Sequence, residues 1–392
     1  MATIDKLREY RSFIRILKKM SLCVGLWPVT ETNKLQRLLP TIGFISCAMA
    51  SYVIMNFVLI YHADIPAMTS GLGLAGSYMT TALKIFCVDY NREILKVLHA
   101  TLDRFIDKVL NESTIRSEVL NKFSTFRKLS VAFTCFVFSS VTAHILAPMF
   151  HMISQLIRQV EPIEYASVIP AVYPWTSSGG LLFCCEFVFE SLSAYVIFFV
   201  ATSVNVRFLV YIYQISGTLT AMSYQLTNLQ DNDDDYDAIV RECVKNYVSL
   251  LECCGIIETI YGPIVLWMAG TSAIVLCTDI FRISTTDDPS FGFLCVIIAY
   301  MGAEAMQTFM CAWAGSVLTT ESEKFAEAIY ASNWAGSGRI KFMSSILIMV
   351  TQRPLVITVC HFSTVSIDMF AKILNTAVSY FFLLRTMQDK TS

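Results

Sequence analysis

Charged residues are scarce in this chain. They make up 15% of its 392 residues, whereas hydrophobic residues make up 55%. An average soluble domain carries roughly 25% charged residues, and a soluble chain of this length needs a large charged surface. Disorder does not explain the shortfall, because disordered chains are polar and this one is not. The composition therefore predicts an integral membrane protein.

Signals for catalysis, metal binding and nucleic-acid binding are also missing. The five histidines form no paired metal-ligand pattern, and the thirteen cysteines include no Cys-x-x-Cys pair. No nucleophile elbow, phosphate loop or dinucleotide fingerprint occurs. The net charge of −2 comes without a basic domain, which argues against a nucleic-acid partner. We therefore predict a protein that is not an enzyme and that uses no cofactor or metal.

Seven stretches are long and apolar enough to cross a membrane, which takes about 20 residues. The last of them contains Arg353, Asp368 and Lys372, so we divide it into a shorter first helix and a spanning helix from about residue 366. Residues 1–37 form a separate segment that precedes the spans. The seven spans are predicted at residues 38–61, 65–87, 129–155, 183–211, 256–280, 289–320 and 342–387.

Lysine and arginine residues gather on one side of these spans. The segment 1–37 and the loops after the second, fourth and sixth spans hold 21 of them, and the opposite side holds four. Because basic residues accumulate in cytoplasmic loops, the N-terminus is predicted inside the cell and the C-terminus outside. The first 20 residues place Leu7, Tyr10, Ile14 and Leu17 on one helical face, which favours an amphipathic helix on the inner leaflet.

Short sequences near the C-terminus carry a family resemblance. They are YMGAEAMQTF at 300–309, TESE at 320–323, QRPL at 352–355 and SYF at 379–381, with LWP at 26–28 near the start. Together they resemble the insect odorant receptor family. The C-terminal part of the match covers about 90 residues.

The resemblance implies an all-α membrane protein of seven helices that forms one subunit of a tetrameric, ligand-gated, non-selective cation channel. Its partners would be a small volatile ligand, membrane lipid and an olfactory coreceptor subunit in a heterotetramer. The family's coreceptor has a long insertion between spans four and five, whereas here that loop is short and holds the acidic run 231–237. An odour-tuned subunit in the plasma membrane of a sensory dendrite is therefore implied.

The resemblance also implies a ligand pocket between spans two, three, four and six. His144 stands where the family pattern favours an aromatic residue, and it could either add a hydrogen bond to the pocket or pack as a satisfied core residue. Glu304 is interpreted as a buried structural partner rather than a ligand contact. The implied pocket residues are Leu74, Ser77, Tyr78, Val137, Ser140, His144, Phe187, Glu190, Tyr300 and Ala303.

The last helix lines the pore in this family, and Leu383 corresponds to the narrow hydrophobic gate. A stripe that faces lipid or another helix is the alternative interpretation, and Lys372 could either line the pore or reach toward the membrane surface. The implied pore face is Lys372, Thr376, Ser379, Leu383 and Met387. The implied anchor between subunits contains Tyr330, Trp334 and Arg353, although ordinary aromatic packing would also explain the first two.

Three other readings remain open at this level. A gustatory-type chemoreceptor channel would share the fold and differ in its ligands. A G-protein-coupled receptor also has seven spans, but its N-terminus lies outside the cell, which the charge distribution opposes. A transporter commonly contains internal repeats, and the sequence contains none that we can detect.

Overall fold

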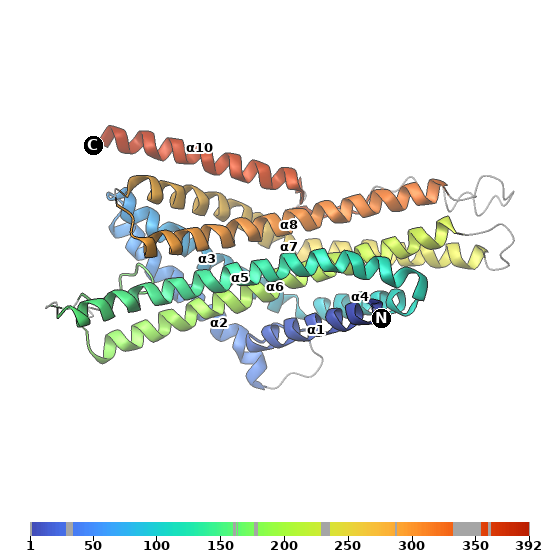
Figure 1. Ribbon diagram of the computed structural model, residues 1–392, viewed down its shortest axis with the longest axis horizontal. Coiled ribbons are helices and arrows are strands. Elements are labelled where there is room, and N and C mark those ends of the chain that lie inside the picture. The colour runs from blue at the N-terminus through green and yellow to red at the C-terminus, as the bar shows by residue number, and fades with distance from the viewer. Residues whose placement is uncertain are drawn as a thin grey trace.

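The chain is described here by a computed structural model that covers residues 2–28, 34–159, 162, 164–175, 179–228, 236–286, 288–331, 354–359 and 362–391. Within these residues the protein is helical except for loops and one small hairpin. That hairpin pairs β1 (Thr358–Val359) with β2 (Ser363–Thr364) in antiparallel register. The long helices run side by side along the longest axis of the molecule (Figure 1).

Seven helices of the described residues are long and apolar enough to cross a membrane, which confirms the predicted fold class of a seven-helix membrane protein. A short helix α1 (Ala2–Cys23) precedes them, and α4 (Arg92–Asn111) separates the second from the third. The seven are α2 (Lys34–Ile60), α3 (Ile65–Tyr90), α5 (Ser113–Ile157), α6 (Leu181–Thr227), α7 (Tyr236–Thr285), α8 (Phe291–Ala331) and α10 (Ile367–Thr391).

Four of these helices are much longer than the spans predicted from the sequence. Helices α5, α6, α7 and α8 contain 45, 47, 50 and 41 residues. Charged residues ended the predicted spans at the membrane edge, but the helices continue beyond it because apolar residues recur at helical spacing. On α5, for example, Ile115, Val119 and Phe123 are buried on one face. These extensions, together with α1 and α4, form the basic end of the molecule.

The apolar face of the N-terminal helix packs on protein. Its predicted apolar face is real, since Tyr10 and Leu17 are buried. The Tyr10 ring lies edge-on to Phe123 of α5, with centroids 5.0 Å apart, and 5.9 Å from the ring of Tyr213 on α6. The sequence showed which face of α1 is apolar, but not that the extensions of α5 and α6 would cover it.

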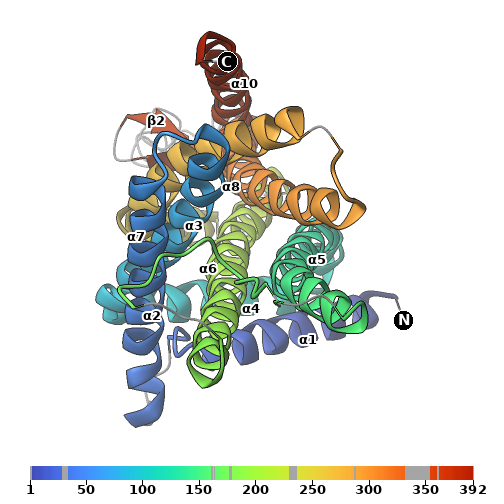
Figure 2. The ribbon, with the colours of Figure 1, turned by 90° about the vertical axis from the view of Figure 1, so that its left-hand side faces the viewer.

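Helix α10 lies at the edge of the bundle, where Figure 2 shows it projecting from the other helices. One face packs on α7, with Ile373 and Ala377 buried, while most of its other residues are exposed. Its start approaches α8 closely: a Cβ at Gly315 would overlap the carbonyl oxygen of Val365. Only glycine therefore fits at this point of the α8–α10 contact.

Candidate functional site: an internal cavity among α3, α5, α6 and α8

A cavity lies inside the helix bundle, toward the end opposite the basic end. It offers about 70 Å³ to the centres of water molecules, compared with roughly 10–15 Å³ needed for one water. It is therefore large enough for a compact organic molecule. Its walls are Leu74, Ser77, Tyr78, Thr80, Thr81 and Lys84 of α3, Val137, Ser140, Val141 and His144 of α5, Val168 and Ile169 of a loop, Ala194, Ile197 and Ala201 of α6, and Tyr300, Ala303, Glu304 and Gln307 of α8.

The structure brings together most of the residues that the sequence predicted for a pocket. From α3, α5 and α8 the predicted residues in the cavity wall are Leu74, Ser77, Tyr78, Val137, Ser140, His144, Tyr300 and Ala303. The predicted residues of α6, Phe187 and Glu190, lie outside this wall. Helix α6 instead contributes Ala194, Ile197 and Ala201, which lie one to three turns further along it. Contact of any of these residues with a ligand stays a prediction.

Glu190 organises the loop that closes one side of the cavity. Its carboxylate is fully buried and accepts hydrogen bonds from the Ser167 hydroxyl (2.7 Å), the Val168 backbone N–H (2.8 Å) and the Tyr173 hydroxyl (2.9 Å). These bonds hold Val168 and Ile169 against the cavity, where both are buried. A lone glutamate in an apolar span was the sequence signal for this role, because a buried carboxylate needs several donors.

A polar network forms the deepest part of the cavity wall. The Lys84 ammonium donates to Gln307 Oε1 (2.8 Å), which also accepts from Asn205 Nδ2 (2.9 Å). Gln307 Nε2 lies 3.5 Å from Glu304 Oε2, and Ser77 donates to Glu304 Oε1 (3.0 Å). This Lys84–Gln307–Glu304 network joins α3, α6 and α8. The prediction that Glu304 has buried structural partners agrees with these contacts, although Glu304 also borders the cavity.

The aromatic groups of the wall are fixed by hydrogen bonds of their own. The Tyr300 hydroxyl lies 3.0 Å from the Gly73 carbonyl oxygen and 2.7 Å from Ser77 Oγ. The Tyr78 hydroxyl lies 3.1 Å from Ser193 Oγ. The His144 ring lies edge-on to the Tyr300 ring, with centroids 5.6 Å apart. The wall is thus largely preformed, as is usual for small-molecule sites.

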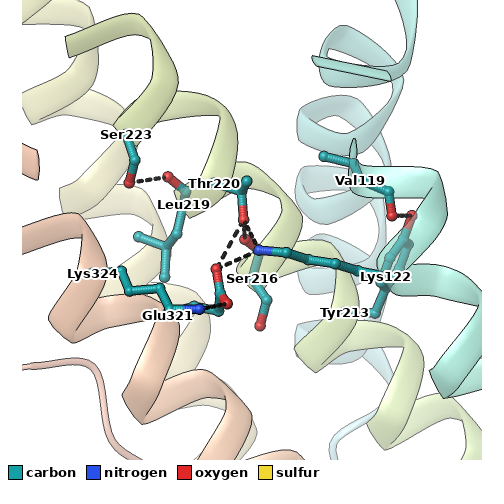
Figure 3. A network of polar contacts seen from close by, with 9 residues as sticks. All are labelled: Val119, Lys122, Tyr213, Ser216, Leu219, Thr220, Ser223, Glu321 and Lys324. Atoms are coloured by element: carbon teal, nitrogen blue, oxygen red, sulfur yellow. Dashed lines mark hydrogen bonds and ion pairs between the residues drawn. The ribbon is translucent and has the colours of Figure 1, made fainter. Parts of the chain in front are cut away.

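A second polar network lies on α8 at the basic end of the molecule. The Lys122 ammonium of α5 donates to Glu321 Oε2 (2.7 Å) and to Thr220 Oγ1 of α6 (2.9 Å), as Figure 3 shows. Thr220 Oγ1 also donates to Glu321 Oε2 (3.0 Å), and Lys324 bonds the other carboxylate oxygen (3.0 Å). We call this the Lys122–Glu321 network. It clamps α5, α6 and α8 together.

The predicted pore residues lie on the uncovered side of α10. Lys372, Thr376, Ser379, Leu383 and Met387 are all exposed, and Leu383 retains 55% of its accessible surface. On another side of the helix, Ala377 packs against Leu276 and Cys277 of α7.

The predicted subunit anchor is only partly described by the structure. Tyr330 lies near the end of α8 and is 72% exposed. Trp334 and Arg353 lie outside the described residues, so their place in an anchor stays a prediction.

Comparison with known proteins adds a family and a fold. A family model described as "7tm Odorant receptor" matches residues 64–378. Odorant receptor 13a of Drosophila melanogaster is 28% identical over 160 residues, which span 38% of this chain and 38% of that relative. Odorant receptor 67b of the same fly is 21% identical over 71% of this chain and 68% of the relative. The odorant receptor coreceptor of Anopheles gambiae is 30% identical over 153 residues, or 38% of this chain and 32% of that protein.

A solved structure shares the arrangement of the helices. The insect olfactory receptor OR5 from Machilis hrabei, solved in complex with eugenol, matches with a TM-score of 0.80 and 13% sequence identity. The match covers 96% of this chain and 98% of that one. At this identity the likeness establishes the fold.

Proposed function

Because this chain belongs to the odorant receptor family, we propose that it is an odour-tuned subunit of a ligand-gated, non-selective cation channel. It binds a small volatile molecule in the internal cavity, and the bound ligand opens a gate on α10. Four subunits, including the olfactory coreceptor, surround one pore in the plasma membrane of a sensory neuron. The N-terminus lies in the cytoplasm and the C-terminus outside the cell.

The single observation that carries this proposal is the cavity among α3, α5, α6 and α8. Its wall combines aliphatic side chains such as Leu74, Val137 and Ile197 with a few hydroxyl and amide groups. Such walls suit small apolar ligands that carry one polar group. Apolar burial is non-directional, so several ligands of similar shape would bind.

The uncovered side of α10 supports the position of the pore. Leu383 and Met387 are 55% and 51% exposed within one subunit, so both side chains are available for contact with neighbouring copies of α10. Four copies around an axis would bring the Leu383 side chains together in a ring. A hydrophobic constriction of this kind closes by excluding water, so we assign the gate to Leu383.

A continuous set of contacts supports coupling between the cavity and α10. Ser272 of α7 bonds Glu304 Oε2 (3.3 Å) and lies 2.8 Å from Thr308 Oγ1. One turn further along α7, Leu276 and Cys277 pack against Ala377 of α10. A ligand that binds the open arrangement more tightly than the closed one would shift both helices through these contacts.

Charge and loop length support the remaining parts of the proposal. The basic residues at the end formed by α1, α4 and the helix extensions suit a cytoplasmic location. Helix α6 ends at Thr227 and α7 begins at Tyr236, so the connection lacks a long insertion, as in odour-tuned subunits. The similarity to a coreceptor over 153 residues supports assembly of related subunits.

Whole-cell current tests the function directly. The chain is expressed with and without a coreceptor subunit, with G-protein signalling blocked, and a broad volatile panel is applied. We expect a rapid cation current that needs the coreceptor. A response that disappears when G-protein signalling is blocked would contradict the channel assignment. A tag on the C-terminus should be accessible on intact cells, and an accessible N-terminal tag instead would favour a G-protein-coupled receptor.

The gate assignment is tested by Leu383→Ala, which should raise the basal current by widening the constriction. Leu374→Ala is the matched control, because Leu374 is exposed and lies about two and a half helical turns before Leu383, on the opposite side of the helix. The gate would not lie at Leu383 if Leu383→Ala left the basal current and the odour response unchanged. The same would follow if both variants raised the basal current equally.

A further inference from the structure

Two polar groups of the cavity wall have no hydrogen-bond partner among the described residues, whereas the other polar side chains of the wall are hydrogen-bonded. Tyr300, Ser77, Glu304 and Gln307 are linked by the hydrogen bonds described above. The hydroxyl of Ser140 and the Nε2 atom of His144 accept and donate no hydrogen bond among the described residues. Both residues line the cavity, and Ser140 is only 5% exposed. They lie one turn apart on the same face of α5.

The hydrogen bonding of His144 defines which of its nitrogens can accept. Nδ1 lies 2.9 Å from the backbone carbonyl oxygen of Ser140. A carbonyl oxygen can only accept, so Nδ1 carries the proton of the neutral ring. Nε2 then presents a lone pair as a hydrogen-bond acceptor. The neighbouring Ser140 hydroxyl is free to donate.

An acceptor and a donor one turn apart match a ligand hydroxyl, which donates through its hydrogen and accepts through its oxygen. We propose that the cavity selects volatile alcohols and phenols, whose hydroxyl donates to His144 Nε2 and accepts from the Ser140 hydroxyl. This inference rests on the proposed function, in which the cavity binds volatile ligands.

Other ligand classes satisfy this pair less well. An ether or ester oxygen can only accept, so it leaves the lone pair of His144 unpaired, and a hydrocarbon leaves both groups unpaired. An unpaired buried polar group costs the free energy of its lost hydration. The charged groups of the wall, Lys84 and Glu304, already bond to Gln307 and to hydroxyl groups, so a charged acid or amine would have to disrupt those bonds to gain a partner, which is costlier still.

The experiment compares isomeric alcohols and ethers on the channel formed with the coreceptor. The probes are hexanol with methyl pentyl ether, phenylethanol with benzyl methyl ether, and benzyl alcohol with anisole. Each pair has one atomic composition and nearly one size, and its members differ in whether the oxygen carries a hydrogen and in where the oxygen stands in the chain. We expect at least one alcohol to activate at about a tenfold lower concentration than its ether, as one hydrogen bond permits.

Variants of α5 assign that preference to the two side chains. His144→Phe keeps a ring against Tyr300 but removes Nε2. The channel should then need about a tenfold higher concentration of the alcohol, whereas the activating concentration of the ether should not change. Ser140→Ala should cause a smaller loss in the same direction. The matched control is Thr142→Val, because Thr142 has a buried hydroxyl without a partner on the same helix but does not line the cavity.

The outcomes separate this inference from the proposed function. Ethers that match or exceed their alcohols in every pair, or an alcohol-to-ether ratio unchanged in His144→Phe and Ser140→Ala, would overturn the inference alone. Currents evoked by esters or hydrocarbons but by none of the alcohols would do the same. A chain that reaches the surface with the coreceptor and conducts in response to no volatile would overturn the proposed function. If His144→Phe fails to reach the surface, Ser140→Ala decides.

Discussion

Helix α8 carries two glutamates within the bundle, the buried Glu321 and the half-buried Glu304. Each lies near a lysine of another helix, but their surroundings differ. At the basic end, Glu321 forms direct ion pairs with Lys122 and Lys324 at 2.7 and 3.0 Å. About 25 Å further along the helix, Glu304 makes no direct ion pair in the described structure. Lys84 reaches the amide oxygen of Gln307 instead, and Glu304 is bonded by hydroxyl groups.

The difference follows from access to water. The Lys122 side chain is 30% exposed, so the ammonium of that pair remains partly hydrated. Lys84 is 1% exposed and lies at membrane depth, where each charge must be satisfied by protein groups. Neutral amide and hydroxyl groups of α3, α6, α7 and α8 form the hydrogen bonds to Lys84 and Glu304. The Lys122–Glu321 network therefore acts as a structural clamp, whereas the Lys84–Gln307–Glu304 network borders the cavity and is placed to respond to what binds there.

Removing the deep lysine should have the largest effect. Lys84→Met leaves Glu304 without a nearby positive charge and should cost about 3–5 kcal/mol of stability. We expect Lys84→Met to yield little monodisperse protein in detergent. Its Tm, measured by gel filtration after heating, should be strongly lowered. Lys324→Met, at a side chain that is 58% exposed, is the control and should lie near wild type. Equal stability of the two variants would contradict the contrast between the networks.

Moving the carboxylate of Glu304 to position 307 should destabilise the protein less than removing it. Glu304→Gln leaves Lys84 as a buried charge and should cost about 2–3 kcal/mol. The double variant Glu304→Gln, Gln307→Glu puts a carboxylate where Lys84 already bonds at 2.8 Å, so it should recover most of that loss. A double variant less stable than the single one would show that Glu304 is needed at its own position. The measurement is again Tm in detergent.

Glu321→Gln should cost less, about 1–2 kcal/mol, because water partly compensates the lost charge on Lys122. High salt should narrow the difference in Tm between this variant and wild type, since exposed ion pairs are screened. The same addition of salt should leave the effect of Glu304→Gln unchanged. An equal salt response of the two glutamate variants would remove the distinction between a hydrated and a deep network.

The smallest expected effect on stability comes from His99 of α4, which lies outside both networks. Its ring packs edge-on against Trp27, 4.9 Å away, and burial lowers the pKa of His99 below its ordinary value of 6.5. Its Nδ1 is buried without a partner, so protonation there is disfavoured in the fold. Below about pH 6.5 the unfolded chain binds the proton more readily, and stability should fall as pH falls.

The measurement for His99 is Tm between about pH 7.5 and pH 5. His99→Phe should flatten part of the decline in this range. A wild-type protein that becomes more stable toward acid pH would contradict the sign of this prediction.

Much of the cavity wall could be predicted from the family resemblance, which implied Ser77 on α3, His144 on α5 and Tyr300 on α8, and all three lie in the wall. The wall residues of α6, Ala194, Ile197 and Ala201, are apolar like most of their neighbours, so the sequence did not distinguish them. The implied residues of α6, Phe187 and Glu190, lie outside the wall. The loop residues Val168 and Ile169 could not be predicted, because only the bonds to Glu190 bring them to the cavity.

By itself, the sequence determined that this is a seven-helix membrane protein, because long apolar runs can be accommodated only by helices in a bilayer. It also determined the asymmetry of basic residues and the family. Tertiary structure decided where the helices end and that the apolar face of α1 packs on α5 and α6. It also decided which polar groups are paired. Pairing depends on distances between helices far apart in sequence, so only the folded bundle shows that His144 and Ser140 are left open to a ligand.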